Sequence, residues 1–508
     1  MPLARKFFPD LVLVFVATAL LLVNLQYSPG LWFDEGAILH VAKNLALYGQ
    51  YGTRVLSNFD LFDPFVTSGP ALIVPVAVLL RFLGVGVLQA RLVAIAYALA
   101  LLVALLAVAR RLGGKFTAVA AGIILVFGTE YLMLSREVMG EVPATCLAFL
   151  GLILWDRARQ QEKRVARYGL LAGTGLLWGG AVLTKNMMIL LFLGLLLYYL
   201  VMRFYRSPEP WSVIVIPLVA GGAMLAIWYS VQLAVLGRDM FLANLVTIRQ
   251  FQQVQAACFC ARRMLGTAKD LVLSPLVWVG ALGVAELVSM RRRPNPVAVL
   301  IASLIVTWFA WYVIASIGWT RYAFTGMALL TIPAALWLHW VWEGRSPVPL
   351  ARLWSFVSLR YDRLPLAGRR LGVVLIVGLG IAGSPARIAD AVFAPDYSVA
   401  SLAHVVGDTV PEGDAIETWE WQVGFLIDRD FHYPSFAVED VMIRHVQLGT
   451  PLPDDLYDPR SYPTQWLIDG PFNKWTHLYT EGFLKQNYVL VRSVGPYDLY
   501  RRLEPARP

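Results

Sequence analysis

The stretch that decides the fold is LVLVFVATALLLVNL at residues 11–25, with Trp32-Phe33-Asp34-Glu35 a few positions after it. The first segment is apolar and follows Arg5-Lys6, as in a signal peptide. No small-residue cleavage site clearly follows it, so we expect an uncleaved first membrane span. Ionisable groups beside hydrocarbon are costly and usually functional. The acidic pair at positions 34 and 35 therefore favours an enzyme that works at a membrane surface.

The composition of the whole chain is typical of a membrane protein. Of its 508 residues, 58% are hydrophobic and only 15% are charged, and the mean hydropathy is +0.61. A soluble domain this apolar would aggregate, so we expect a polytopic α-helical membrane protein. The formal net charge is +9. The basic residues cluster in short loops, which indicates cytoplasmic loops and not a nucleic-acid surface; the clusters lie at 110–115, 157–167, 203–206, 291–293 and 345–370.

About eleven apolar segments approach the length that a membrane span requires. They are residues 9–27, 88–109, 116–134, 142–156, 168–184, 186–202, 212–235, 271–290, 297–317, 322–342 and 371–391. With the N-terminus inside, every basic cluster falls on the cytoplasmic side and the C-terminus lies outside. Residues 70–83 are also apolar but make only half a span, so we expect a re-entrant or outer-leaflet helix. Counting them as a full span would place the basic clusters outside.

This topology divides the chain into two domains. Residues 1–394 form the membrane domain, with outward segments at 28–69, 135–141, 236–270 and 318–322. Residues 395–508 contain no spanning segment and are long enough for a small extracytoplasmic domain. Strands are expected at 415–419, 464–468, 488–494 and 497–501, and helices at 399–408 and 436–448. A small α/β lid over the membrane part is the predicted arrangement.

The acidic candidates lie in two outward segments. Asp34 and Glu35 could supply a general base, because a carboxylate near a low-dielectric wall can accept a proton from a hydroxyl group. The structural alternative is that the pair stabilises the N-terminus of a helix beginning near Gly36, which is worth about 1 kcal/mol. Glu141 follows Arg136 and Glu137 in the second outward turn and could line the same cleft. It could equally begin a helix, and Arg136 could pair only with a neighbouring carboxylate.

The basic candidates on the outer side are Lys185 and Arg321. Because cations are disfavoured on that side, each needs a partner. An anionic phosphate at the outer leaflet would be one partner, since guanidinium offers it paired donors. A neighbouring carboxylate is the alternative.

Metal ligands and nucleotide motifs give no signal. The six histidines lack the spacing of metal ligands, and no Gly-rich phosphate loop precedes a Lys-Ser or Lys-Thr pair. Cys146 is expected to pack in an apolar run. Cys258 and Cys260 fit two ordinary thiols or a local bridge better than a metal site.

Taken together, the motifs resemble those of the GT-C glycosyltransferases that use lipid-phosphate sugars. The nearest likeness is to family 39, which includes protein O-mannosyltransferases and lipid A aminoarabinose transferases. The matching pieces are Trp32 to Glu35, Ala42 to Leu45, Ser68 to Leu72, Ala90 to Leu92, Ser135-Arg136 with Glu141, Leu183 to Lys185, and Arg321-Tyr322. The resemblance implies a GT-C membrane fold with an outer C-terminal domain.

The resemblance also implies roles for single residues. Asp34 matches the catalytic first-loop carboxylate, and Glu35 matches the second letter of the acidic pair. Glu141 matches a second acidic position that is usually Asp. Arg321 becomes a candidate for binding the donor phosphate, with Lys185 and Arg136 as further candidates. The family often has His-Pro-Pro or Lys-Pro-Pro where this chain has Ser68-Gly69-Pro70, which removes one phosphate-binding cation.

The implied reaction transfers a sugar from a polyprenyl-phosphate donor to a hydroxyl group at the outer face of the cell membrane. Asp34 would act as general base, the anomeric centre would invert, and the cations would stabilise the leaving phosphate. The acceptor could be a protein, a lipid or a glycan. No cofactor is required, although Asp34 with Glu141 could hold Mg or Mn.

Two other classes of protein stay open. A transporter or flippase of lipid-linked sugars would also have many spans and intramembrane charge. Against it, no inverted repeat is visible and the charges gather at one face. A non-catalytic scaffold could use the aromatic stretch from Trp419 to Pro434 to bind a sugar or a protein, although core packing would explain these residues as well.

Overall fold

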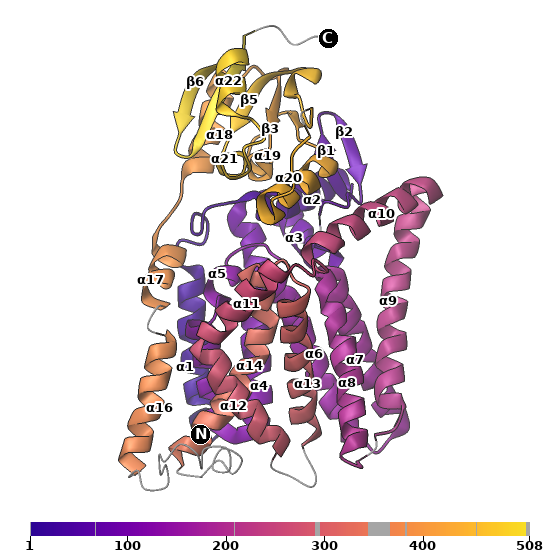
Figure 1. The fold of residues 1–508 in the computed structure, drawn as a ribbon, viewed down its shortest axis with the longest axis vertical. Helices are drawn as coiled ribbons and strands as arrows, with labels where there is room; N and C mark the ends of the chain where they lie inside the picture. The colour runs from indigo at the N-terminus through magenta and orange to yellow at the C-terminus, as the bar shows by residue number, and fades with distance from the viewer. Residues whose placement is uncertain are drawn as a thin grey trace.

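A layer of long helices carries an α/β domain at one end (Figure 1). The computed structural model describes residues 2–66, 68–207, 209–289, 295–343, 366–381, 384–453 and 455–503. The long helices are α1 (Pro2–Leu22), α4 (Val87–Gly128), α6 (Glu141–Arg159), α7 (Arg164–Thr184), α8 (Leu190–Phe204), α9 (Ser212–Leu236), α12 (Pro275–Ser289), α13 (Pro296–Ile314), α14 (Thr320–Trp342) and α16 (Leu366–Ile381).

Helical structure occupies all of the predicted apolar segments. Two of them, 88–109 and 116–134, fall largely within α4, whose helical geometry breaks at Gly114. The φ of this glycine is +80°, a conformation that residues with a side chain rarely adopt. The break separates α4 into two helices, and Gly122 of the second packs against Leu102 and Leu106 of the first. The basic clusters at 291–293 and 345–365 lie outside the described residues.

Fewer helices meet a strict test of length and hydropathy. Within the described residues, five helices are long and apolar enough to cross a membrane, or six if α11 (Ala261–Leu273) and α12 form one span bent by 80°. Helices α1 and α3 (Pro70–Leu83) contain shorter apolar stretches. The fold is that of a polytopic α-helical membrane protein, and the full set of eleven spans stays a prediction.

The segments predicted to be outer loops contain regular structure. The first loop forms α2 (Phe33–Tyr48) and a hairpin of β1 (Gly52–Val55) and β2 (Asn58–Leu61). Residues 236–270 form α10 (Arg238–Gln255) and most of α11 instead of a loop. The remaining short helices of the membrane domain are α5 (Tyr131–Ser135), η1 (Asn186–Ile189), α17 (Ser384–Ile388) and η4 (Ala389–Phe393).

The C-terminal domain is built on a five-stranded mixed sheet in the order β4-β3-β5-β7-β6. The strands are β3 (Ala415–Thr418), β4 (Phe431–His432), β5 (Thr464–Asp469), β6 (Tyr488–Val494) and β7 (Tyr497–Arg502). Strand β3 pairs in parallel with β4 and β5, and β7 pairs antiparallel with β5 and β6. The helices are α18 (Ser398–Thr409), α19 (Trp421–Leu426), α20 (Phe436–Leu448), η5 (Pro459–Ser461), α21 (Pro471–Thr476) and α22 (Glu481–Asn487). The predicted strands and helices of this domain are confirmed.

The C-terminal domain packs directly on the first loop. At Gly36, in the first turn of α2, an added Cβ would lie 2.2 Å from the backbone nitrogen of Gln422. Only glycine permits this approach of α2 to α19. Lys43 Nζ then donates to the carbonyl oxygens of Gly424 and Phe425, each at 3.2 Å. These contacts fix the domain above the helix that carries Asp34.

Candidate active site

A cavity of about 690 Å³ lies where the helical layer meets the C-terminal domain. Its walls come from the first loop, the turn before α6, the starts of η1 and α14, the end of α10, and helices α20 and α21. The lining includes Trp32, Phe33, Asp34, Phe65, Glu130, Met133, Glu137, Met139, Lys185, Phe251, Gln255, Trp319, Arg321, Tyr322, Glu439, Ile443, Phe472 and Trp475. The cavity therefore has charged groups on a largely apolar and aromatic lining.

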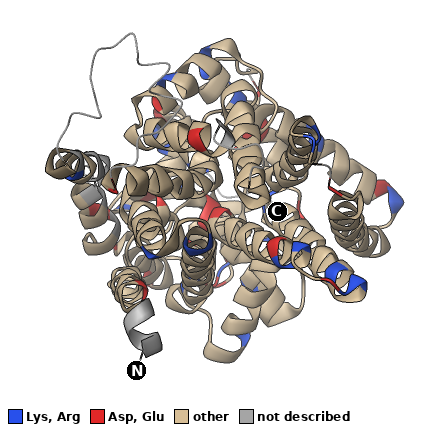
Figure 2. Cartoon of the chain, turned by 90° about the horizontal axis from the view of Figure 1, so that it is seen from below, with Lys and Arg blue, Asp and Glu red and all other residues tan. Residues whose placement is uncertain are grey.

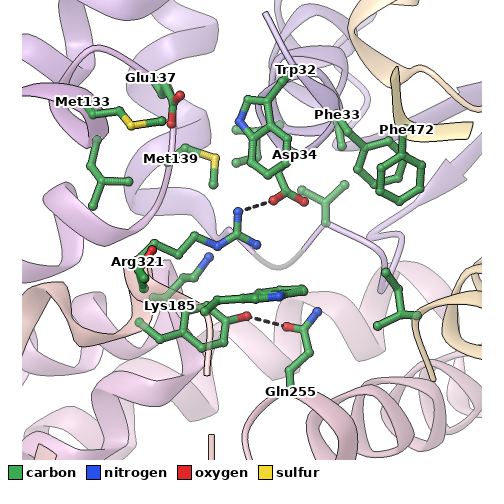
Figure 3. A pocket seen from close by; sticks show the side chains of 18 of the residues that line it. Trp32, Phe33, Asp34, Met133, Glu137, Met139, Lys185, Gln255, Arg321 and Phe472 are labelled. Carbon is green, nitrogen blue, oxygen red and sulfur yellow. Dashed lines mark hydrogen bonds and ion pairs between the residues drawn. The ribbon is translucent and has the colours of Figure 1, made fainter. Parts of the chain in front are cut away.

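Asp34 lies in the first turn of α2, as the helix-terminus alternative also predicted. Its side chain is 31% exposed and forms an ion pair with Arg321 Nη1. Figure 3 shows the carboxylate and the guanidinium facing each other inside the cavity. An acid in this turn gains from the positive end of the helix dipole, which accounts for the local preference. Its free edge is open to a ligand in the cavity.

Arg321 lies in the first turn of α14 and is held on several sides. Its guanidinium carbon is 5.3 Å from the ring centre of Trp32, 4.6 Å from that of Trp319 and 5.7 Å from that of Tyr322. These distances allow cation–π attraction to each ring. Its Nε lies 3.8 Å from Glu141 Oε1. The guanidinium is thus fixed between two carboxylates.

Glu141 and Lys185 form the second ion pair of the site. Lys185 Nζ lies 2.9 Å from Glu141 Oε1, and both side chains are almost completely buried. Glu141 begins α6, and Lys185 stands between α7 and η1, so three helix ends meet here with α14. Tyr322, beside Arg321, donates from its hydroxyl group to Gln255 Oε1 at 2.7 Å. The structure therefore brings together Asp34, Glu141, Lys185 and Arg321.

Glu35 points away from the cavity. Its two carboxylate oxygens accept from Arg91 Nε at 2.9 Å and Nη2 at 2.6 Å, and Oε1 also accepts from the backbone of Val138 at 3.0 Å. Neither Glu35 nor Arg91 has an exposed side chain. This placement gives Glu35 a role in fastening α2 to α4, in place of the expected contact with substrate.

Arg136 also lies outside the cavity lining. Its guanidinium donates to the carbonyl oxygens of Leu20, Leu21, Val23 and Ser28 at 2.6–3.1 Å. Leu20 and Leu21 belong to the last turn of α1, and Val23 and Ser28 follow it. Backbone acceptors at a helix end lack helical partners. The side chain thus caps α1, in place of the expected contact with the donor phosphate or with a neighbouring carboxylate.

The residues that sequence reasoning missed belong to the C-terminal wall and to α10. Glu439 and Ile443 come from α20, Phe472 and Trp475 from α21, and Phe251 from the end of α10. Of these elements, only the helix at 436–448 was predicted, without an indication of which of its faces meets the membrane domain.

The aromatic stretch proposed as a binding surface is largely packed inside the C-terminal domain. Trp419, Trp421 and Tyr433 are buried, and the rings of Trp421 and Tyr433 stack with their centres 3.8 Å apart. This arrangement supports the core-packing alternative. Cys146, Cys258 and Cys260 are free thiols.

The pair considered for Mg or Mn has a protein cation as its neighbour. No group of three or more His, Cys, Asp or Glu residues in the described part of the chain is arranged to hold one. Asp34 and Glu141, the pair considered for Mg or Mn, both face Arg321, so a cation already stands between them.

Near the cleft, burial lowers the pKa of His40 to about 3, and its Nε2 accepts from the backbone of Arg54 at 3.1 Å.

Comparisons with known proteins agree with this architecture. The dolichyl-phosphate-mannose-protein mannosyltransferase family model matches residues 70–228. That segment includes Glu141 and Lys185 but neither Asp34 nor Arg321. No curated protein matches the sequence at a significant level.

Solved structures match nearly the whole chain. ArnT from Cupriavidus metallidurans bound to undecaprenyl phosphate has a TM-score of 0.64 at 16% identity, with 99% of each chain covered. The apo oligosaccharyltransferase of Archaeoglobus fulgidus has a TM-score of 0.59 at 12% identity, covering 98% of this chain and 75% of that one. The archaeal AglB in complex with an inhibitory peptide and a dolichol-phosphate has a TM-score of 0.57 at 11% identity, covering 99% and 75%. This chain therefore has the GT-C fold of these membrane glycosyltransferases.

Proposed function

We propose that this chain is an inverting glycosyltransferase that moves a sugar from a polyprenyl-phosphate donor to an acceptor hydroxyl group at the outer face of the membrane. The observation that carries the proposal is the cluster of Asp34, Arg321 and Lys185 in a cavity between the membrane helices and the C-terminal domain. Glu141 lies outside the cavity lining and pairs with Lys185 and Arg321. The structural matches to proteins bound to undecaprenyl phosphate and dolichol-phosphate support a lipid phosphate as ligand.

The phosphate of the donor would bind Arg321 and Lys185. Both cations are paired with carboxylates in the structure, so an entering phosphate competes for them. Guanidinium is well suited to the exchange because its planar donors match phosphate oxygens. Once Arg321 turns to the phosphate, the carboxylate of Asp34 is released from its partner and can accept a proton.

The chemical step follows from this exchange. Asp34 takes the proton of the acceptor hydroxyl group while that oxygen attacks the anomeric carbon. The bond between the anomeric carbon and the phosphate oxygen breaks, and polyprenyl phosphate leaves with its charge stabilised by Arg321 and Lys185. A single displacement inverts the anomeric centre. Glu141 holds Lys185 and the side of Arg321 in position.

The outward orientation of the cavity is supported by charge. The described basic residues at the helix ends opposite the cavity include Arg110, Arg111, Arg157, Arg159, Arg164, Arg167 and Arg203. Figure 2 views the chain from that opposite end and shows Lys and Arg at several helix ends. Short cytoplasmic loops are enriched in these residues. The basic end is therefore proposed to face the cytoplasm, with the cavity on the other side.

The test is product formation by the purified full-length protein in lipid nanodiscs. Polyprenyl phosphates carrying radiolabelled mannose, glucose or arabinose are supplied with an envelope extract as the source of acceptor. The glycosyltransferase proposal predicts labelled product together with free polyprenyl phosphate. A flippase or a scaffold would leave the lipid-linked sugar intact, so failure of every donor to release polyprenyl phosphate would contradict the proposal.

A further inference from the structure

Glu439 places a carboxyl group with one unpaired oxygen in the wall of the cavity. It lies on α20 of the C-terminal domain and is 6% exposed. Its Oε2 is buried and has no hydrogen-bond partner within the described protein atoms. A buried carboxyl oxygen without a partner is costly, so this group needs an explanation. Glu439 lines the same cavity as Asp34 and Arg321.

The electrostatic surroundings of Glu439 favour its uncharged form. Burial is the largest cause of a pKa raised well above the ordinary value, and the nearby carboxylates of Asp34, Asp63 and Asp440 raise it further. Asp440 has its own partner, because it accepts from Arg444 Nε at 2.8 Å. Asp63 accepts from Thr53 and from the backbone of Phe65. These surroundings favour the protonated carboxyl group, which has a hydrogen atom to donate.

Aromatic rings accompany this donor on the same wall. Phe472 and Trp475 come from α21, and Trp475 remains 43% exposed. Phe472 stacks on Phe33 of the first loop with ring centres 3.5 Å apart, which fixes the wall against α2 (Figure 3). A hydrogen-bond donor beside aromatic faces matches a sugar ring, whose hydroxyl groups accept hydrogen bonds while its C–H faces pack on the rings.

We infer that Glu439 donates a hydrogen bond to a hydroxyl group of the sugar carried by the lipid phosphate. This inference rests on the proposed function, since Arg321 and Lys185 would hold the phosphate. The sugar is bonded directly to that phosphate, so its ring must occupy the adjoining space of the cavity. A neutral carboxyl group can serve there because it does not repel the phosphate, whereas an ionised one would. The C-terminal domain thereby recognises the sugar.

Thermal stability separates sugar recognition from a purely structural role of Glu439. A structural role predicts that an apolar replacement lowers thermal stability. Because the unpartnered oxygen does not stabilise the fold, we expect an apolar replacement of similar size to leave thermal stability unchanged or raise it. The informative variants are Glu439→Leu, which removes the donor, and Glu439→Gln, whose amide can still donate. Asp440→Asn is the matched control, because Asp440 neighbours Glu439 on α20 but pairs with Arg444 outside the cavity lining.

The experiment measures binding to the full-length protein in nanodiscs. The probes are a polyprenyl phosphate without sugar and the same lipid carrying mannose, glucose or arabinose. We expect the wild-type protein to bind at least one glycosylated lipid more tightly than the bare one. Glu439→Leu should lose about tenfold of that preference, the effect of one buried hydrogen bond. Glu439→Gln and Asp440→Asn should keep most of it, and binding of the bare lipid should stay unchanged in all variants.

Three results would overturn the inference: no preference for a glycosylated lipid in the wild-type protein, an unchanged preference in Glu439→Leu, or equal weakening of bare and glycosylated lipids by that variant. Failure of the wild-type protein to bind the bare polyprenyl phosphate would instead overturn the proposed function, and this inference with it.

Discussion

Asp34 and Arg321 are 287 positions apart in the sequence, yet their side chains form an ion pair inside the cavity. The pair joins the first turn of α2 to the first turn of α14. It also keeps the proposed base and the proposed phosphate-binding group occupied with each other in the absence of substrate. Binding of the donor and activation of the base would thus be one event.

Asp34→Asn should abolish sugar transfer. A positioned general base contributes about 10²–10⁴-fold to a rate, and asparagine cannot accept the proton. Binding of bare polyprenyl phosphate should be retained or strengthened, because Arg321 loses its competing carboxylate. Transfer and lipid binding are measured on the same preparation, with Asp60→Asn on exposed β2 as control. Full activity in Asp34→Asn would refute its role as base.

Arg321→Ala should weaken binding of the donor. Hydrogen bonds to charged groups contribute about 1.5–3 kcal/mol, which corresponds to about 10–100-fold in affinity. Arg321→Lys should recover only part of the loss, because an ammonium lacks the planar paired donors. The control is Arg262→Ala, which removes an exposed cation of α11. Equal affinities for bare polyprenyl phosphate in wild-type and Arg321→Ala protein would contradict the assignment.

Glu35→Gln should lower stability and leave donor binding of the folded protein intact. Breaking a buried ion pair by removing one partner costs about 3–5 kcal/mol, because the remaining charge of Arg91 has no counterion. Replacing Glu35 and Arg91 together by leucine should cost less stability than the sum of the losses from Glu35→Leu alone and Arg91→Leu alone. Thermal unfolding in detergent checks the stability, and lipid binding below the transition checks the function. If the stability losses of the two single leucine variants add up to the loss of the double variant, Glu35 and Arg91 are not energetically coupled.

Arg136→Leu should also act on stability. The change leaves the carbonyl groups at and beyond the end of α1 without their donor, and each buried unpaired acceptor costs about 1–3 kcal/mol. Arg136→Lys should be more stable than Arg136→Leu, because its ammonium group can still donate to some of these oxygens. It should be less stable than the wild-type protein, because an ammonium group reaches fewer of them than a guanidinium does. If Arg136→Leu loses donor affinity while its thermal stability is unchanged, the capping role is contradicted and Arg136 binds the donor phosphate instead.

Glu137 should impose a pH dependence on stability and donor binding. Burial and the charge of Glu35 raise the pKa of Glu137 to about 8, while Arg91 and Arg321 oppose the rise and Glu141 adds to it. The folded protein therefore holds a proton that the unfolded chain releases near pH 4.5, so stability falls as pH rises from about 4.5 to 8. Above pH 8 the ionised group adds negative charge to the cavity.

The matching measurement follows thermal unfolding from pH 5 to 9 and the KM for the donor from pH 7 to 9. Glu137→Gln should flatten both profiles, because its amide does not ionise. Identical profiles for the wild-type protein and Glu137→Gln would show that another group titrates in this range.

Much of the architecture could be predicted from local patterns. Apolar runs located the helices, because burial in hydrocarbon requires long uninterrupted stretches. In the C-terminal domain, the turn Gly495-Pro496 between two strand-like runs predicted the hairpin of β6 and β7. The helices of residues 236–270 were missed because their polar composition is also typical of a loop. Their conformation depends on packing against the other elements, and no local pattern states that packing.

The site was predictable only in part. Asp34 and Glu35 are adjacent, but successive residues of a helix point about 100° apart, so only one of them faces the cavity. The sequence alone does not show which of the two carboxylates faces the cavity. Glu439 was missed for a related reason: one acid on an amphipathic helix looks like any other until the opposite wall is known.

The approach of α19 to Gly36 has a consequence for how the protein is made. The cavity residues of α2 and α14 precede those of α20 and α21 in the chain, so they leave the ribosome first. A partly synthesised chain therefore has no enclosed pocket, even when its first helices are already inserted. The proposed donor therefore meets a complete cavity only after α20 and α21 have been translated and have packed on the membrane helices.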